Sequence, residues 1–338
     1  MEFIMRDPLK QAVEAASGGR NTVIYDKYGN PSIMVIIPKF KKESIDASLG
    51  TGVHEAFIVH GREVPEIFYP KYGNLLMNNG CACSMPGVEP QTSIDFDDAR
   101  NACVKKGKGW HLASNAEWAA VALWSFKNGT MPRGNNNYGQ DITNGWETGR
   151  PIGVLDSGRT AKVATGSGPA TWSHDHTPAG VYDMNGNTWD WQSGMKIIGG
   201  KIYVQGEDGV PMNNFDTGDA ENDTTGWLDT GVYYSVSGNK ITVAGSQTAQ
   251  GSNGNTFDSV AGASGYTVPA WMKSLALVPY TATGSGDWYH VNTDGERLPF
   301  RGGHWDHQAY AGLFLLDLLN PRSLVLWSVG FRAAYIPQ

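Results

Sequence analysis

The amino-acid sequence predicts an α+β fold in which two helices accompany many short strands and long irregular loops. Of the 338 residues, 43 are glycine, 12 are tryptophan and 14 are tyrosine, a composition typical of a loop-rich protein with β-structure rather than a helical bundle. Hydrophobic residues make up 40% of the chain and charged residues 17%, which indicates a folded globular protein. This length allows one large domain or two modest ones.

The first part of the chain is predicted to be a small unit rich in β-structure. A short helix is expected over residues 8–17, ended by Gly18 and Gly19. Runs of β-branched and aromatic residues predict strands at residues 21–25, 32–37, 56–59 and 66–69. We therefore expect residues 1–75 to form an N-terminal β-rich unit that mounts the protein on a larger assembly.

The second part, residues 76–338, is expected to be a ligand-binding domain that begins with two helices. The first helix is predicted over residues 96–106, because Asp95 is a suitable N-cap and Gly107 a suitable stop. The second helix opens at a capping box a few residues later, so the two helices are close together in the sequence.

Ser114 and Glu117 form this capping box, in which the serine side chain accepts from the third amide and the glutamate accepts from the cap amide. The helix that follows runs to Lys127. An uncharged stripe at helical spacing predicts that it packs on a core. The stripe consists of Trp118, Val121, Ala122 and Ser125.

The middle of the chain lacks the pattern of long regular elements. Residues 129–195 are rich in Gly, Asn, Pro and Trp, which predicts structured loops held by side-chain to backbone bonds. Residues 196–290 are polar with short β runs, and we expect them to be a β insertion in the larger domain. Its candidate strands are 196–198, 201–204, 233–236 and 240–243, the last two joined by a hairpin turn.

The last 38 residues contain two kinds of position in alternation. One kind has the character of a scaffold: Arg301, Gly302, Gly303, Trp305, Gly312, Phe314, Arg322, Trp327, Gly330, Phe331 and Arg332. Between them lie chemically unrelated side chains: His304, Asp306, His307, Tyr310, Leu315, Asp317, Leu319, Leu324, Leu326 and Ser328. A fixed frame that carries arbitrary side chains suits a surface built to bind, and to be changed, better than an active site.

Three motifs carry a resemblance to a known family. They are GWHLASNAEW at 109–118, GVYDMNGNTWDW at 180–191, and FRGGHW at 300–305 with GFR at 330–332. In this order they resemble the formylglycine-generating-enzyme type of C-type lectin fold over roughly residues 80–338. The resemblance implies a compact α+β fold with two helices, a twisted antiparallel sheet and much irregular structure.

Within that fold the chain is similar to the variable proteins of diversity-generating retroelements. This resemblance implies a diversified segment at about residues 300–332, changed at adenines of AAC-type codons, and a non-enzymatic receptor-binding protein of phage or prophage origin. The ten unrelated side chains are all reachable from such a codon. Tryptophan is not reachable from such a codon, which agrees with Trp305 and Trp327 as frame residues. The other predicted frame residues of the site are Arg301, Arg322 and Arg332.

The spacing within the segment supports this division. In an extended strand, residues two apart share a face. Leu315, Asp317 and Leu319 would then share one face, and residues 324, 326 and 328 would likewise share one. We expect these two faces to be exposed, and an exposed patch of Leu, Tyr and His is typical of a protein-binding surface.

Two other functions remain open from the sequence. A metal-dependent oxidase or sulfoxide synthase of the formylglycine-generating-enzyme type would need copper-binding cysteines, which are absent after residue 103, or an iron-binding histidine set. The candidate histidines are His174, His176, His290, His304 and His307. A calcium-dependent carbohydrate-binding lectin is the other alternative, and a structural calcium is possible, but no other cofactor or catalytic residue is expected.

Composition also limits the partners and the location. The formal charge of −7 argues against nucleic acid as the main partner, and no run of about 18 apolar residues predicts membrane insertion. The first ten residues lack the pattern of a secretory signal. Cys81, Cys83 and Cys103 are expected to be free thiols. We expect a protein receptor or other surface ligand, a possible homo-oligomer, and a location in a virion, such as a phage tail, or at a cell surface.

Overall fold

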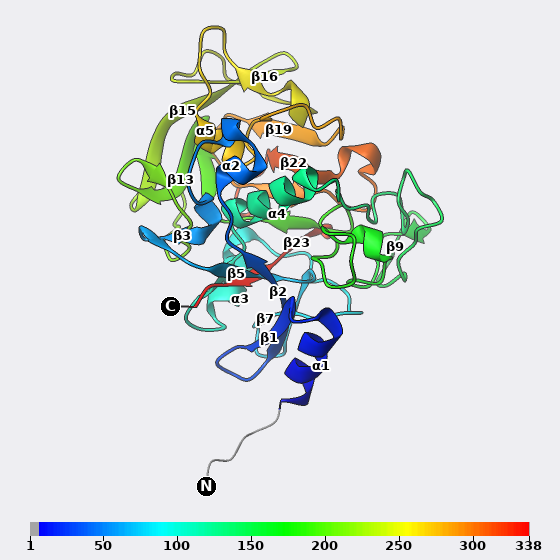
Figure 1. Cartoon of the computed structure of the whole chain (residues 1–338). Coiled ribbons are helices and arrows are strands. Elements are labelled where there is room, and N and C mark those ends of the chain that lie inside the picture. The colour runs from blue at the N-terminus through cyan, green and yellow to red at the C-terminus, as the bar shows by residue number, and fades with distance from the viewer. Residues whose placement is uncertain (1–6, 338) are drawn as a thin grey trace.

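A computed structural model of the chain describes residues 7–337 and confirms the predicted α+β class. Three sheets and several two-stranded ribbons surround a central helix, as Figure 1 shows. The N-terminal residues on which the absence of a secretory signal was predicted lie mostly outside the described residues. The helices are α1 (Pro8–Ser17), α2 (Lys42–Ile45), α3 (Phe96–Val104), α4 (Asn115–Lys127) and α5 (Ala270–Ser274).

The five-stranded sheet joins the two ends of the chain. In spatial order its strands are β1 (Asn21–Tyr25), β2 (Pro31–Pro38), β5 (Glu66–Pro70), β24 (Ala333–Tyr335) and β8 (Trp110–Leu112). All neighbours are antiparallel, and β24 pairs with β5 at Tyr335 and Phe68. The β-rich residues of the predicted N-terminal unit therefore share a sheet with the C-terminal strand.

The six-stranded sheet carries the C-terminal segment. Its order is β17 (Ser252–Thr256), β19 (Trp288–Asn292), β22 (Gly312–Leu318), β21 (Phe300–Gly302), β11 (Trp189–Trp191) and β23 (Val329–Phe331). Two of these strands, β17 and β19, come at least partly from the predicted insertion over residues 196–290. The insertion therefore contributes to the main sheet and is not a separable appendage.

A third sheet contains most of the insertion. Its strands are β18 (Ala261–Gly262), β16 (Lys240–Ala244), β15 (Trp227–Ser237), β13 (Lys201–Glu207), β12 (Met195–Ile198) and β20 (Glu296–Arg297), with β14 (Val210–Pro211) on β13. The predicted hairpin is confirmed, since Ser237 pairs with Lys240 across the turn. Short ribbons are β3 (Ile58–Val59) with β4 (Arg62–Glu63), β6 (Asn74–Leu76) with β7 (Ala82–Ser84), and β9 (Leu155–Asp156) with β10 (Arg159–Thr160).

Local signals in the sequence define the helix ends. Asp95 accepts the amide of Asp98 and caps α3, which ends at Val104, slightly before the predicted Gly107. Gly18 ends α1 with a φ of 62°, a left-handed conformation that glycine adopts without strain. The capping box of α4 is present in both directions. The predicted strand at 56–59 is shorter, because residues 55–57 form a 3₁₀ turn.

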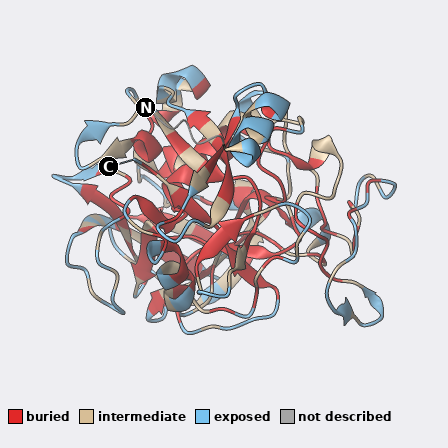
Figure 2. Ribbon diagram, turned by 90° about the horizontal axis from the view of Figure 1, so that it is seen from below, coloured by how far each residue is buried: buried red, intermediate tan, exposed pale blue. Residues whose placement is uncertain are grey.

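Helix α4 lies at the centre of the molecule between the sheets (Figure 1). Its predicted apolar stripe is buried, and so are most of its other residues. The largest apolar cluster includes Trp118 and side chains from the third sheet and from β22. Figure 2 shows the buried ribbon gathered in the middle and the exposed segments at the periphery. Among residues 7–337, no helix is both long and apolar enough to cross a membrane.

Loss of the cap should weaken α4 measurably. Ser114 is buried, and its Oγ accepts the Glu117 amide over 3.2 Å. We predict that Ser114→Ala lowers the free energy of unfolding by about 1–2 kcal/mol, because the amide loses its partner away from water. Chemical denaturation measures this value. Ser237→Ala, at an exposed hairpin position, is the matched control and should change stability by less than about 0.5 kcal/mol; equal losses in both variants would contradict the prediction.

Candidate ligand-binding face

Two C-terminal loops meet over strand β11 because of the order of the sheet. Residues 303–311 follow β21, and residues 319–328 precede β23. Both of these strands are direct neighbours of β11, one antiparallel and one parallel. The start of the first loop and the end of the second loop therefore lie at the same end of β11, although β22 separates the two loops in the sequence.

The β9–β10 ribbon forms the third side of this face. The indole nitrogen of Trp305 donates to a carboxylate oxygen of Asp156 over 3.0 Å. The hydroxyl of Tyr138 donates to Asp306 over 3.4 Å, and the Arg159 guanidinium lies 3.3 Å above the Tyr138 ring. Hydrogen bonds and a cation–π contact thus connect the two C-terminal loops' neighbours on this side to the 303–311 loop. We call the three segments together the C-terminal face.

The most exposed predicted contacts are apolar or aromatic. Tyr310 is 52% exposed and Leu326 is 40% exposed. Tyr310 packs against Trp288 with ring centroids 5.0 Å apart, so one of its sides is supported. The other predicted contacts that keep some exposure are His304, Asp306, His307, Asp317, Leu319 and Leu324.

Leu315 is not a surface residue, so its predicted exposure is wrong. It is 0% exposed and belongs to an apolar cluster that includes Trp189 and Phe300. On the other face of the same strand, Leu316 belongs to the largest cluster. Strand β22 is therefore covered on both faces. The alternation of side chains along this strand does not separate exposed residues from buried ones.

The predicted alternation over residues 324–328 is also wrong. The segment turns instead of extending: the Val329 amide donates to the Leu326 carbonyl over 3.1 Å, and the Ser93 amide donates to the same oxygen over 3.0 Å. Ser328 is buried, and its carbonyl accepts the Trp189 amide. Three consecutive side chains are exposed as a result, namely Val325, Leu326 and Trp327.

Trp327 differs from the other predicted frame residues because it is 40% exposed. Its ring packs edge-on against the fully buried Trp305, with centroids 4.6 Å apart. One part of Trp327 thus belongs to the frame, and the other part is available on the surface. Val325 is 52% exposed, whereas the predicted alternation placed it on the opposite side from Leu324 and Leu326. No signal in the sequence indicated the contribution of the β9–β10 ribbon.

Arg301 is a buried cation satisfied mainly by carbonyl oxygens. Its guanidinium donates to the Asn115 side-chain oxygen over 2.7 and 3.1 Å and to the carbonyl of Ala276 over 3.1 Å. Longer bonds reach the carbonyls of Phe314 and Leu315. Burial lowers the pKa of Arg301 to about 10, which leaves it charged at neutral pH. This residue holds β21, β22 and the start of α4 together.

Arg322 anchors the 319–328 loop through carboxylates. Its guanidinium pairs with Glu296 over 2.9 Å, with Asp219 over 3.2 Å and with Asp97 over 2.7 Å. Lys196 joins the same group by pairing with Glu296 and Asp219. The loop is therefore fixed to the third sheet and to α3 at its first residues, and its exposed residues follow this anchor.

Asp287 supports the other loop from below. Its carboxylate accepts the Phe314 amide over 2.7 Å, and a Cβ atom at Gly312 would lie 2.3 Å from its Oδ1. Only glycine at position 312 allows this close approach. Burial raises the pKa of Asp287 to about 7. Asp317, on the same strand as Gly312, is also affected by burial, which raises its pKa to about 6.

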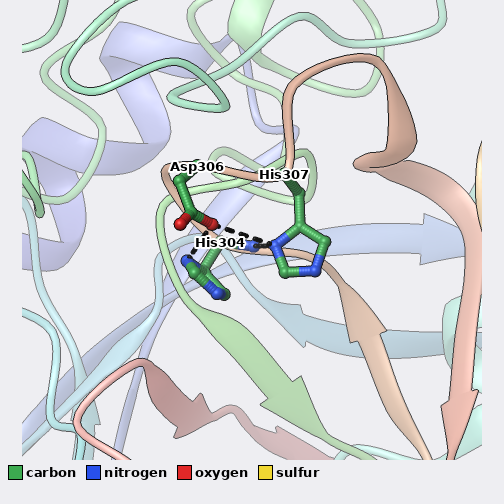
Figure 3. Close-up of side chains that lie close together, drawn as sticks. All are labelled: His304, Asp306 and His307. Carbon is green, nitrogen blue, oxygen red and sulfur yellow. Dashed lines mark hydrogen bonds and ion pairs between the residues drawn. The ribbon is translucent and has the colours of Figure 1, made fainter.

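His304, Asp306 and His307 form a compact group in the 303–311 loop (Figure 3). A carboxylate oxygen of Asp306 lies 3.1 Å from His304 Nδ1 and 3.6 Å from His307 Nδ1. Burial lowers the pKa of His304 to about 4 and that of His307 to about 3, so both imidazoles are neutral at pH 7. Within residues 7–337 this is the group that brings three potential metal ligands within 4.8 Å.

The other histidine candidates do not converge on a metal site. His174 is buried, and its Nδ1 accepts the Val181 amide over 2.8 Å. The Nε2 atom of His176 instead lies 3.0 Å from the Met131 carbonyl. His290 lies on β19, with Ser252 as its neighbour. The three cysteines are free and buried, as predicted.

Comparisons with known proteins give a family match and three partial likenesses. Residues 71–248, just over half of the chain, match the family described as "Sulfatase-modifying factor enzyme 1-like domain". A curated protein of Bos taurus, "Inactive C-alpha-formylglycine-generating enzyme 2", is 26% identical over 129 residues. That alignment covers 36% of this chain and 40% of the relative, so the chain matches less than half of the relative's length.

Two solved structures are similar at low identity. "Treponema denticola variable protein 1" is 14% identical with a TM-score of 0.36, and the alignment covers 94% of this chain and 99% of that one. "Major Tropism Determinant U1 Variant" is 12% identical with a TM-score of 0.31, covering 90% of this chain and 62% of that one. At these scores the two likenesses carry no argument about the ligand or the function of this chain.

The buried carboxyl of Asp287 predicts a pH dependence of stability. Its pKa is about 7 in the folded state and about 3.9 when unfolded, so the folded state keeps a proton that the unfolded state has lost. The contribution of Asp287 to stability therefore falls as the pH rises from about 4 to about 7. We predict that Asp287→Asn removes roughly 3 kcal/mol of this fall, measured by denaturation at both pH values. Asp294→Asn, at a 96% exposed side chain, is the control; identical pH slopes for wild type and Asp287→Asn would refute the prediction.

Proposed function

The chain belongs to the family of Sulfatase-modifying factor enzyme 1-like domains, and we propose that it uses this fold to bind a ligand rather than to catalyse a reaction. One observation carries the proposal: exposed apolar side chains stand on a frame of buried arginines and a buried tryptophan. Tyr310, Val325, Leu326 and part of Trp327 form the exposed set. The curated bovine relative is named inactive, which agrees with this proposal over the aligned third of the chain.

The chemistry of the face suits a protein receptor or a similar surface ligand. Aromatic and aliphatic side chains supply most binding energy in protein interfaces, and polar groups around them set specificity. Here Tyr310 and Leu326 would be central contacts, and Asp306 and Asp317 would lie in the polar rim. The wider set of contacts is proposed to be His304, Asp306, His307, Tyr310, Leu319, Leu324, Val325, Leu326 and Trp327, with Asp317 at the edge.

The rigidity of the frame favours binding. Ordering loops on association costs free energy, and this cost falls when the loops are already fixed. The Arg322 ion pairs and the hydrogen bonds of Ser93 and Trp189 to the 326–328 backbone fix one loop before any ligand arrives. Oligomerisation would add avidity to a weak single site. A location in a virion, such as a phage tail, or at a cell surface follows from this role.

An oxidase of the formylglycine-generating-enzyme type is less well supported. Cysteine is absent after Cys103, and the three cysteines present are buried, so thiolate ligation of copper at the C-terminal face has no ligand in the chain. A structural calcium stays a prediction.

Measurements of folding stability can test whether the exposed contact residues are independent of the buried frame. We predict that Tyr310→Ser, Val325→Ser and Leu326→Ser each change the free energy of unfolding by no more than about 0.5 kcal/mol, because all three side chains are exposed and lie outside the buried clusters. Leu315→Ala should lose about 2–5 kcal/mol, since it leaves a cavity in a packed cluster. Thermal and chemical denaturation give both values. Collapse of the three serine variants, or tolerance of Leu315→Ala, would contradict a separate frame.

Diversification is tested by nucleotide sequence. We predict a near-copy of the 3′ end of the gene downstream of it, beside a reverse transcriptase, with differences only at adenines. Differences should fall in the codons of positions such as 310 and 326 and spare those of Arg301, Trp305 and Arg332. A gene whose surroundings contain no such copy, and whose codons for these positions are constant across isolates, would overturn diversification but leave ligand binding to be tested on its own.

A further inference from the structure

The His304–Asp306–His307 group has the dimensions of a metal site. In a tetrahedral site with bonds of about 2.0–2.1 Å, two ligand atoms lie about 3.3 Å apart. The Asp306 oxygen is 3.1 Å from one imidazole nitrogen and 3.6 Å from the other, which brackets this value. The three residues lie within four consecutive positions of one loop, and their ligand atoms are within 4.8 Å of one another. Figure 3 shows both rings directed toward the carboxylate.

An unpaired nitrogen indicates that the group is incomplete without a further partner. His304 Nδ1 is shielded from solvent and forms no hydrogen bond of acceptable geometry, although the Asp306 oxygen is near. Buried polar atoms without a partner are rare in native proteins, and a bound ion can satisfy such an atom. The Nδ1 atom of His307 has only a long bond of 3.4 Å from the His304 amide. An ion at this nitrogen would replace that weak bond.

We propose that His304, Asp306 and His307 bind one divalent transition-metal ion of the zinc type, with a fourth position open to water or to a donor from another molecule. The proposal does not depend on the proposed function. It differs from any cysteine-based site, because its ligands are two imidazoles and a carboxylate. Three protein ligands and an open position are common in zinc sites that bind an external group.

The ligand types select the metal. Imidazole nitrogen suits Zn²⁺, Cu²⁺, Ni²⁺ and Fe²⁺, whereas Ca²⁺ and Mg²⁺ require a shell of oxygen ligands. With one carboxylate and two imidazoles the group is unsuited to calcium. The surrounding rings restrict the imidazoles: Trp189 lies edge-on to His307 at 4.6 Å, and Trp305 lies at 4.7 Å from His304. The ligands are therefore partly positioned before an ion binds, which lowers the cost of ordering them.

The test is a titration of metal-free full-length protein with Zn²⁺, followed by calorimetry. We expect one Zn²⁺ per chain and a higher melting temperature with the ion than without it. Asp306→Asn and His307→Ala should each weaken binding by more than about 100-fold, since even outer partners of a metal site contribute 10–100-fold. Ca²⁺ should not bind at this group. The matched control is His290→Ala, which removes a half-buried histidine on β19 and should leave the affinity unchanged.

Two results would overturn the proposal: absence of Zn²⁺ binding by the wild-type protein, or undiminished binding by folded His307→Ala. Should a variant fail to fold, X-ray absorption of the wild-type zinc complex decides, because two imidazole nitrogens and a carboxylate oxygen support the site and an oxygen-only shell refutes it. The stability of each variant without metal, compared with that of the wild type, separates loss of a ligand from loss of the fold.

Discussion

The buried ion pair between Arg332 and Asp190 joins the two sheets on which the C-terminal face depends. Arg332 lies between β23 of the six-stranded sheet and β24 of the five-stranded sheet, and its Nε donates to Asp190 over 2.7 Å. Its remaining donors reach the carbonyls of Tyr182 and Asp183 at 2.9 Å each. Taking two charges out of water costs several kcal/mol per ion, and these bonds offset that cost only while both partners are present. The pair therefore fixes the relative position of the sheets rather than adding much net stability.

Strand β11 connects this ion pair to the binding face. Asp190 is its middle residue, and the two tryptophans beside it point away from the carboxylate into one apolar cluster, where Trp191 packs on Phe300 at 4.0 Å. Trp189 reaches His307 on the face itself. Since the strands on either side of β11 carry the two loops, a shift of this strand would displace both loops together. The face is thus positioned by the most deeply buried part of the molecule, although its own side chains contribute little to the core.

Local signals were predictable from the sequence, whereas partners distant in the chain were not. The capping box at Ser114 and the Asp95 cap each depend on neighbours in the sequence, and both are confirmed. The family match over residues 71–248 confirms the resemblance and includes two of the three motifs from which it was drawn. The pairing of β5 with the C-terminal strand was missed because the two strands are far apart in the sequence. Leu315 failed for a related reason: its cover comes from other elements, and a strand buried on both faces shows no useful alternation.

Positions on the C-terminal face differ in how freely they can be substituted, because they differ in how many contacts they make with the frame. Tyr310, Val325 and Leu326 are among the exposed large side chains, so we expect their replacement to alter little that the fold depends on. His304 and His307 are largely buried against Trp189 and Trp305, and a smaller residue there would leave space between rings that are themselves part of the frame. Variation at positions 304 and 307 therefore has a structural limit that variation at positions 310, 325 and 326 lacks. We therefore expect residues of similar volume to be tolerated at positions 304 and 307, and unrelated residues to be tolerated at positions 325 and 326.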